Sequence, residues 1–190
     1  MSGFEEITVS TRTVFEGRVF GVQVDEALLP DGKPITREVV RHTGGASIVA
    51  LDDDGFVYLV RQWRYPFHAE LLEIPAGKLM RGEDPRSCAA RELTEETGMI
   101  AGRMILLGES LATPAYCTEV LHIYLALDLK KSQQCLDEGE FLEVVRLPFW
   151  EVWDGVMQGE IKDAKTQIGI LKAGFWLKSG KDLSVLPSAD

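Results

Sequence analysis

The chain has 190 residues and a net charge of −10, with 20 Lys and Arg against 30 Asp and Glu. Its 45% of apolar residues suffices for a domain with a full hydrophobic core, and no apolar run is long enough to span a bilayer. The acidic N-terminus lacks the basic and apolar regions of a signal peptide. The acidic balance disfavours a nucleic acid or an anionic membrane as partner, because phosphate-backbone binding depends on clustered Lys and Arg.

The three cysteines, Cys88, Cys117 and Cys135, form neither a CxxC pair nor a metal-ligand spacing. Their odd number predicts free thiols in a reducing cytoplasm, not a disulfide framework. There is no internal repeat, low-complexity tract or linker, so we predict a single domain over residues 1–190.

The first half of the chain has the pattern of β-structure. Apolar and small or polar residues alternate over residues 19–25, which predicts a half-buried strand. A turn at 30–33 leads to a second strand at 36–42. Residues 46–63 predict a hairpin of two strands joined at 53–55. We expect the N-terminal strands to form an outlying sheet and the hairpin to enter a central sheet.

The second half mixes strands with helices. Helices are expected at 149–157 and at 163–180, the latter with Asp163 as N-cap and Gly180 at its end. Strands are expected at residues 104–112, 120–129 and 142–149. This mixture predicts an α/β sandwich and not a regular βαβ alternation.

Residues 77–99, GKLMRGEDPRSCAARELTEETGM, contain a further helix crowded with acidic residues. Asp84-Pro85 is a good helix start, and Gly98 suits the left-handed residue that follows a helix end. Helical spacing places three carboxylates within an arc of about 100°, and an adjacent arc is suited to burial against a sheet. The carboxylates are Glu92, Glu95 and Glu96, and the adjacent arc holds Ala89, Ala90, Leu93 and Thr97.

Like charges at this spacing destabilise a helix by a few tenths of a kcal/mol per pair. A divalent cation reverses the sign of that effect. Mg²⁺ takes oxygen ligands and commonly joins one or two carboxylates to substrate phosphates. The crowded carboxylates therefore predict a site for a metal ion and a diphosphate.

The full spacing is far more specific than the acidic cluster alone. Gly77, five residues, Glu83, seven residues, REL, one residue, EE, one residue and GM fix nine positions, a pattern expected by chance about once in 10⁹ starts. This stretch resembles a complete Nudix box, the signature of a superfamily that hydrolyses nucleoside diphosphates linked to another moiety. The resemblance implies an α/β/α sandwich with a mixed central sheet and a strand–loop–helix–loop box.

The resemblance also implies roles within the box. It implies Mg²⁺ or Mn²⁺ bound by Glu92 and Glu96, with the backbone carbonyl of Ala76 as a further ligand. Glu95 is expected to share metals or waters, and Arg91 to hold the carboxylates through charge-assisted hydrogen bonds. The expected structural positions of the box are Gly77, Glu83 (as an orienter of Arg91) and Gly98.

Sequence outside the box points to a subfamily. Pro114 lies 16 residues beyond Gly98, a spacing that resembles ADP-ribose pyrophosphatases. The segments TREVVRHTGGASIVALDDDGFVYLVRQWRYP, ELLEIPAGK and IKDAKTQIGILKA look like the same subfamily, so the resemblance runs from about Arg37 to Ala173. It implies cleavage of ADP-ribose to AMP and ribose 5-phosphate, by a homodimer that exchanges its N-terminal strands to build an adenosine pocket. Expected substrate contacts are Arg37, Arg61, Trp63, Arg64, Glu73 and Pro114.

The acidic loop LDEGEFLEVV is the expected source of a general base. By position, Glu138 resembles the base and Glu140 a further metal ligand, with Asp137 and Glu143 as alternatives. The base, or a metal, would deprotonate a water in line with the departing phosphate, without a covalent intermediate.

Three alternatives remain open. The substrate could be another nucleoside diphosphate sugar or a dinucleotide, such as GDP-mannose, UDP-glucose, NADH or FAD. The domain could instead bind a nucleotide without catalysis and regulate a partner, or use its metal only for stability. In the domain organisation expected here, residues 1–43 form the N-terminal strands, 44–180 the Nudix core and 181–190 a tail.

Overall fold

The structure, a computed structural model, describes residues 3–179 of the chain. Backbone contacts divide the chain into two compact units. The N-terminal unit runs through Gly44 and includes Leu111–Val120, and the core unit holds Gly45–Ser110 and the segment from Leu121 onward. The first boundary falls one residue from the one expected between the N-terminal strands and the core. Whether the chain forms one folding domain stays a prediction.

The N-terminal unit is a three-stranded antiparallel sheet in the order β1-β2-β3. Its strands are β1 (Ile7–Glu16), β2 (Gly21–Leu28) and β3 (Pro34–Arg41). The segment 111–120 joins this unit through β3, where the Val40 N–H donates to the Tyr116 carbonyl over 2.7 Å and the Val40 carbonyl accepts from Thr118 N–H over 2.9 Å. A separate N-terminal sheet was predicted and is confirmed, although its first strand, β1, was not recognised.

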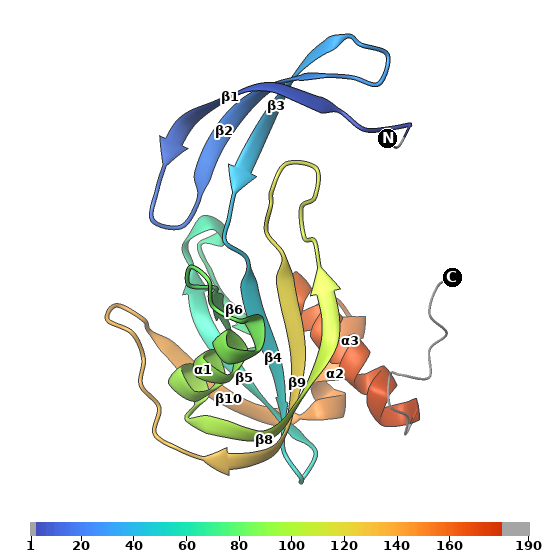
Figure 1. Ribbon diagram of the computed structural model, residues 1–190. Coiled ribbons are helices and arrows are strands. Elements are labelled where there is room, and N and C mark those ends of the chain that lie inside the picture. The colour runs from blue at the N-terminus through green and yellow to red at the C-terminus, as the bar shows by residue number, and fades with distance from the viewer. Residues whose placement is uncertain (1–2, 180–190) are drawn as a thin grey trace. The chain divides into compact units, whose positions relative to one another are not determined.

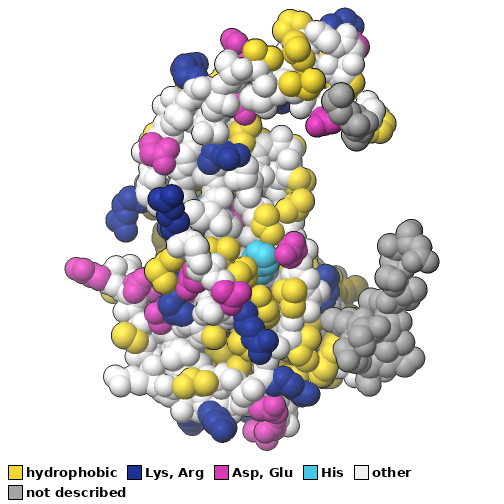
Figure 2. Space-filling model, viewed as in Figure 1, with side chains coloured by type: hydrophobic (Ala, Val, Ile, Leu, Met, Phe, Trp, Pro, Cys, Tyr) yellow, Lys and Arg dark blue, Asp and Glu magenta, His cyan; other side chains and the backbone are white. Residues whose placement is uncertain are grey.

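Apolar side chains are exposed on this sheet, as the yellow atoms over β1–β3 indicate (Figure 2). All ten residues of β1 are exposed. The apolar ones among them are Ile7, Val9, Val14 and Phe15. Within residues 3–179 nothing buries either face of β1, and such exposure of four apolar side chains on one strand is unusual for a monomer.

The core unit contains a mixed seven-stranded sheet with the path β10-β5-β4-β9-β8. Strand β6 pairs with β5 and β7 with β4, and only the β4–β9 pairing is parallel. The strands are β4 (Gly45–Leu51), β5 (Phe56–Arg64), β6 (Ala69–Glu73), β7 (Ala76–Lys78), β8 (Met99–Ser110), β9 (Leu121–Lys131) and β10 (Leu142–Pro148). The predicted hairpin over residues 46–63 is confirmed as β4 and β5.

Helices cover both faces of this sheet (Figure 1). Helix α1 (Pro85–Thr97) lies on one face, and α2 (Phe149–Met157) and α3 (Ala164–Ser179) lie on the other. Strand β4 shows the division residue by residue, because Ile48 packs in the cluster with Leu93 of α1 and Val49 in the cluster with Ile170 of α3. The predicted α/β/α sandwich is therefore confirmed.

Four details differ from the sequence prediction or lie outside the described residues. The strand expected at 104–112 is β8, which begins five residues earlier, at Met99. Ala90 was expected in the buried arc of α1 but is exposed, and Cys88 is buried in its place. Cys88 Sγ lies 3.5 Å from the Lys78 carbonyl, so the buried face is turned toward β7 as well as toward β4. Strand β6 was also not predicted, because it is short, whereas β7 is the strand that the strand–loop–helix–loop box implied. The expected end of the last helix at Gly180 lies outside the described residues.

Among the helices within residues 3–179, none is both long and apolar enough to cross a membrane.

Candidate active site

Helix α1 is fixed at both ends by local sequence. The Asp84 side chain accepts a hydrogen bond from Ser87 N–H over 2.9 Å, and Pro85 occupies the first turn, where its missing N–H costs nothing. At the other end, Gly98 has φ 67° and donates its N–H to the Thr94 carbonyl. The acidic residues of the box are thereby held on a short helix with defined ends, as predicted.

Arg91 joins three glutamates of the box. Its Nη1 donates to Glu92 Oε1 over 2.7 Å and to Glu95 Oε2 over 2.8 Å, and its Nε donates to Glu83 Oε1 over 3.0 Å. The bond to Glu83 is the largest cause of the raised pKa of Arg91, and the same bond lowers the pKa of Glu83. Glu83 also accepts from Met80 N–H over 2.8 Å, so its carboxylate is anchored to the loop before the helix. The structure thus brings together Arg91 and the side chain predicted to orient it.

Glu96 is the most buried of the box carboxylates, at 4% exposed. Burial is the main cause that raises the pKa of Glu96 to about 8, and the charges of Glu92 and Glu140 add to the rise. The Ala76 N–H donates to Glu96 Oε2 over 2.9 Å and opposes the rise. Burial likewise raises the pKa of Glu92, although Arg91 counteracts it. Burial and the neighbouring negative charges therefore disfavour the ionised form of both carboxylates, so ionising the pair without a bound cation is costly.

Gly77 leaves the space that the Glu92 carboxylate fills. A Cβ on Gly77 would lie 1.7 Å from Glu92 Oε1, which no side chain tolerates. The box glycine therefore lets the carboxylate lie directly against the backbone of β7. This close approach, and not a special backbone angle, explains why glycine is needed here.

The donor set of this region fits a hard divalent cation. Its side-chain donors are carboxylate oxygens, and the adjoining backbone adds carbonyl oxygens, which are the ligands of Mg²⁺. Within residues 3–179, however, no three His, Cys, Asp or Glu side chains converge into a ready metal-binding group. In this structure Arg91 bonds Glu92 and Glu95, and a backbone N–H bonds Glu96.

The acidic loop between β9 and β10 is attached to the end of α1. Gln134 Nε2 donates to the Glu96 carbonyl over 2.6 Å, and Cys135 N–H donates to the Glu95 carbonyl over 3.1 Å. Glu140 is close enough for its charge to raise the pKa of Glu96, and its Oε2 accepts from Asp137 N–H over 3.2 Å. Glu138 is exposed in the same loop. The loop predicted to carry a base thus lies beside the box carboxylates.

Arg64, at the end of β5, is paired with Glu73 of β6. Its Nε and Nη2 donate to the two Glu73 oxygens over 2.7 and 2.6 Å, a bidentate geometry. Lys165 Nζ of α3 also donates to Glu73 Oε2, and to Asp163 Oδ1 over 2.9 Å. Sequence reasoning named Arg64 and Glu73 but missed Lys165. A signal was present, because a lysine in the first turn of a helix opposes the helix dipole and needs a compensating acid.

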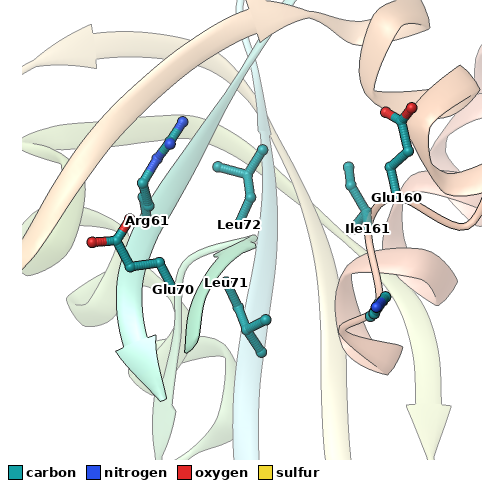
Figure 3. A pocket seen from close by; sticks show the side chains of 7 residues that line it. Arg61, Glu70, Leu71, Leu72, Glu160 and Ile161 are labelled. Atoms are coloured by element: carbon teal, nitrogen blue, oxygen red, sulfur yellow. The ribbon is translucent and has the colours of Figure 1, made fainter. Parts of the chain in front are cut away.

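Arg61 and Trp63 lie on the same strand but have other surroundings. Arg61 lines a cavity of about 250 Å³ between β5, β6 and the loop before α3, and Figure 3 shows it beside Glu70 on one side of that cavity. The remaining lining residues are Leu71, Leu72, Glu160, Ile161 and Lys162. Arg61 Nε also lies 3.4 Å from Glu143 Oε2, which ties it to β10. Trp63 is exposed.

The two remaining predicted residues belong to the N-terminal unit. Arg37 on β3 forms a bidentate pair with Glu6, with Nε and Nη2 donating over 2.9 and 2.6 Å. Pro114 lies in the segment 111–120 that joins that unit.

Comparisons with known proteins agree on a family. The NUDIX domain profile matches residues 41–167. The chain is 40% identical over 169 residues to the methanol dehydrogenase activator of Bacillus methanolicus, covering 88% of this chain and 91% of that one. It is 37% identical over 172 residues to the ADP-ribose pyrophosphatase of Bacillus subtilis (strain 168), covering 90% and 93%. Among solved structures, an ADP compounds hydrolase superposes with TM-score 0.81 at 24% identity, covering 93% of this chain and 96% of that one.

Proposed function

This chain belongs to the NUDIX domain family, and we propose that it is a pyrophosphohydrolase that cleaves ADP-ribose to AMP and ribose 5-phosphate. The observation that carries the proposal is the buried Glu92–Glu96 pair beside Gly77, in a chain 37% identical to an ADP-ribose pyrophosphatase. Ionising two neighbouring buried carboxylates is costly in an ordinary helix. A cation bound with a diphosphate would offset that free-energy cost, because its positive charge pairs with the ionised carboxylates.

The residues that would hold the metal are Glu92, Glu96 and the Ala76 carbonyl, with Glu95 and Glu140 beside them. We propose Mg²⁺ as the cofactor, with Mn²⁺ as an alternative of similar ligand preference. When bound, the metal supplies positive charge that neutralises the diphosphate and polarises its phosphorus. Arg91 holds the carboxylates in place, since one guanidinium bonds both Glu92 and Glu95.

Residues of the chain itself would accept the proton of the attacking water and bind the substrate. The Glu138 carboxylate accepts a proton from the attacking water, whose oxygen forms the new bond to phosphorus while the bridging P–O bond breaks. Arg64 donates its free guanidinium N–H groups to phosphate oxygens of the substrate. Arg61, Trp63 and Glu73 are the further substrate contacts proposed in the core unit. Arg37 and Pro114 are those proposed in the N-terminal unit.

We propose a homodimer in which the N-terminal sheet meets a second copy of the chain. The support is the exposure of all ten residues of β1, four of them apolar. Light scattering of the purified protein tests this, and a monomer at micromolar concentration would contradict it. A cytoplasmic location is proposed from the three cysteines, none of which forms a disulfide.

The function is tested by a substrate panel. ADP-ribose, GDP-mannose, UDP-glucose, NADH and FAD are each incubated with the protein and Mg²⁺, and phosphate is measured after a phosphatase has acted on the products. We expect the highest kcat/KM for ADP-ribose. Equal or faster turnover of a sugar nucleotide without adenine would overturn the substrate assignment while leaving the reaction class intact.

A second candidate function follows from the relative named methanol dehydrogenase activator. We propose as the alternative that this chain binds a dehydrogenase and changes its activity. Exposed apolar side chains on α2 and α3, among them Trp150, Met157 and Phe175, offer a surface for such contact. The test is the rate of a methanol dehydrogenase with and without this protein. Stimulation that persists in a hydrolysis-deficient variant would separate this role from catalysis.

A further inference from the structure

Four charged side chains form a chain of ion pairs across three elements of the core unit. In order they are Asp163, Lys165, Glu73 and Arg64, called here the Asp163–Arg64 chain. Lys165 bonds both acids, and Glu73 bonds both cations. The signs alternate from a negative end at the start of α3 to a positive end at the last residue of β5.

Burial along the Asp163–Arg64 chain is deepest at Glu73, and Arg64 is its most exposed member. The Glu73 side chain is 1% exposed and that of Lys165 is 11% exposed, whereas that of Arg64 is 38% exposed. A charge buried as deeply as Glu73 must be paired to remain ionised. Burial raises the pKa of Glu73, but Arg64 and Lys165 together outweigh it and lower that pKa. The Arg64 end is therefore the more open of the two ends to a ligand.

Arg64 keeps donors for that ligand. A guanidinium has five N–H groups, and Glu73 engages the Nε and Nη2 nitrogens. The charge of Glu96 contributes to the raised pKa of Arg64, after the larger effect of Glu73, so the guanidinium lies within electrostatic reach of the box. A diphosphate bound beside the box carboxylates would find the remaining N–H groups of Arg64.

Lys165 determines the net charge of the group of side chains to which Arg64 belongs. Without Lys165, Arg64 and Glu73 would be a neutral pair. With it, the three side chains carry one net positive charge. Asp163 cancels this charge formally, but it lies at the far end of the chain from Arg64 and its Oδ2 is also stabilised by the N–H and Oγ1 of Thr166 at the positive end of α3.

The same segment fixes the backbone that leads to the box. Thr166 Oγ1 accepts a hydrogen bond from Ile74 N–H over 2.9 Å, directly after Glu73. Glu73 is thus held through its side chain and through its neighbour, so its carboxylate has little freedom to follow Arg64. The start of α3 therefore both holds Glu73, the partner of Arg64, in place and compensates its negative charge.

We propose that Lys165 is a positioning residue for substrate binding: it compensates buried Glu73, so that Arg64 is held at a fixed place with its charge available to the diphosphate. This inference rests on the proposed diphosphate hydrolysis. It assigns no contact between Lys165 and substrate. The effect of Lys165 must therefore pass through Arg64.

A double-mutant cycle tests the inference. Lys165→Met, Arg64→Ala and the double variant are compared with the parent for ADP-ribose hydrolysis. We expect Lys165→Met to raise KM about tenfold with a smaller change in kcat, since a phosphate contact acts in the ground state and the transition state alike. The double variant should be no worse than Arg64→Ala alone, because the effect of Lys165 vanishes once Arg64 is gone. Independent, additive losses in the double variant would overturn the proposal.

Three further variants separate charge from structure. Lys165→Arg keeps the charge and should restore most of the affinity, whereas Lys165→Gln keeps a hydrogen-bond donor and should not. Lys172→Met is the matched control, because Lys172 on the same helix donates to the Leu107 carbonyl and not to Glu73. A KM rise of the same size in Lys172→Met, or full affinity in Lys165→Gln, would reduce Lys165 to a structural role. Lys165→Gln also serves as the test if Lys165→Met does not fold.

A binding measurement distinguishes an error in the role given to Lys165 from an error in the proposed hydrolase function. The affinity for an ADP-ribose analogue with a methylene bridge between its phosphorus atoms is measured by calorimetry for the parent and each variant. A parent that neither hydrolyses ADP-ribose nor binds the analogue refutes the proposed function. A parent that does both, with unchanged affinity in Lys165→Met, refutes only the role of Lys165.

Discussion

The backbone N–H of Ala76 donates a hydrogen bond to the carboxylate of Glu96 over 2.9 Å, joining β7 to the last turn of α1. This bond holds the most buried acid of the box at the end of the sheet strand that carries the box glycine. It also leaves the second oxygen of Glu96 for another partner.

Replacing Glu96 by Gln should reduce hydrolysis by about 10²-fold or more, because the amide keeps the shape but loses the charge that binds a cation. Initial rates with ADP-ribose and Mg²⁺ provide the measurement. The amide oxygen can still accept from Ala76 N–H, so the fold should persist. Glu151→Gln, an exposed position on α2, is the control and should match the parent. Identical hydrolysis rates in Glu96→Gln and the parent would show that catalysis does not take place at this site.

In the metal-free protein, stability should fall as pH rises from about 5 to 8. The folded-state pKa of Glu96 is about 8 against an ordinary 4.5, so the folded protein binds this proton more tightly than the unfolded chain does. Between these pH values the unfolded state therefore holds fewer protons, and stability decreases with pH. Thermal unfolding in EDTA measures the effect, which should be on the order of 5 °C.

Two comparisons sharpen this pH test. Added Mg²⁺ should raise the melting temperature more at pH 8 than at pH 5, since ionised Glu96 then gains a cation. Glu96→Gln should flatten the pH dependence without metal. A slope that is unchanged in Glu96→Gln would show that other groups produce it.

Placing a methyl group at Gly77 should disrupt the site. In Gly77→Ala the new Cβ would overlap Glu92 Oε1, so the carboxylate must move or the strand must shift. Overpacking of this kind costs about 1–3 kcal/mol. We expect lower Mg²⁺ affinity by calorimetry together with lost activity. Gly3→Ala has open space around its Cβ and should change neither.

Glu138→Gln should reduce kcat by about 10²-fold while substrate binding persists, the usual scale for a general base. Glu140→Gln should act differently, by weakening metal affinity, because the charge of Glu140 reaches Glu96. Steady-state kinetics at varied Mg²⁺ concentration separates the two outcomes. If Glu140→Gln alone shows the loss in kcat at saturating Mg²⁺, the base has been assigned two residues too early in the loop.

Elements governed by neighbouring residues could be predicted from the sequence. Helix α1 begins at Asp84-Pro85 and ends at Gly98 because caps act within one helical turn. The β4–β5 hairpin follows from two strand-like segments joined by the turn at residues 53–55. Strand β6 escaped prediction because it is short and takes its place from pairing with β5. Exposure of Ala90 was missed for a similar reason, since the position of β7 decides which side of α1 is covered.

The family, the box and the identity of its acids could be read from residue types at fixed spacing. Which charges meet depends instead on how distant segments pack. Lys165 and Glu73 lie 92 residues apart, and their ion pair exists because packing of α3 against the sheet brings the two segments together. Burial likewise raised the pKa of Glu96, an effect of surroundings that local spacing does not encode.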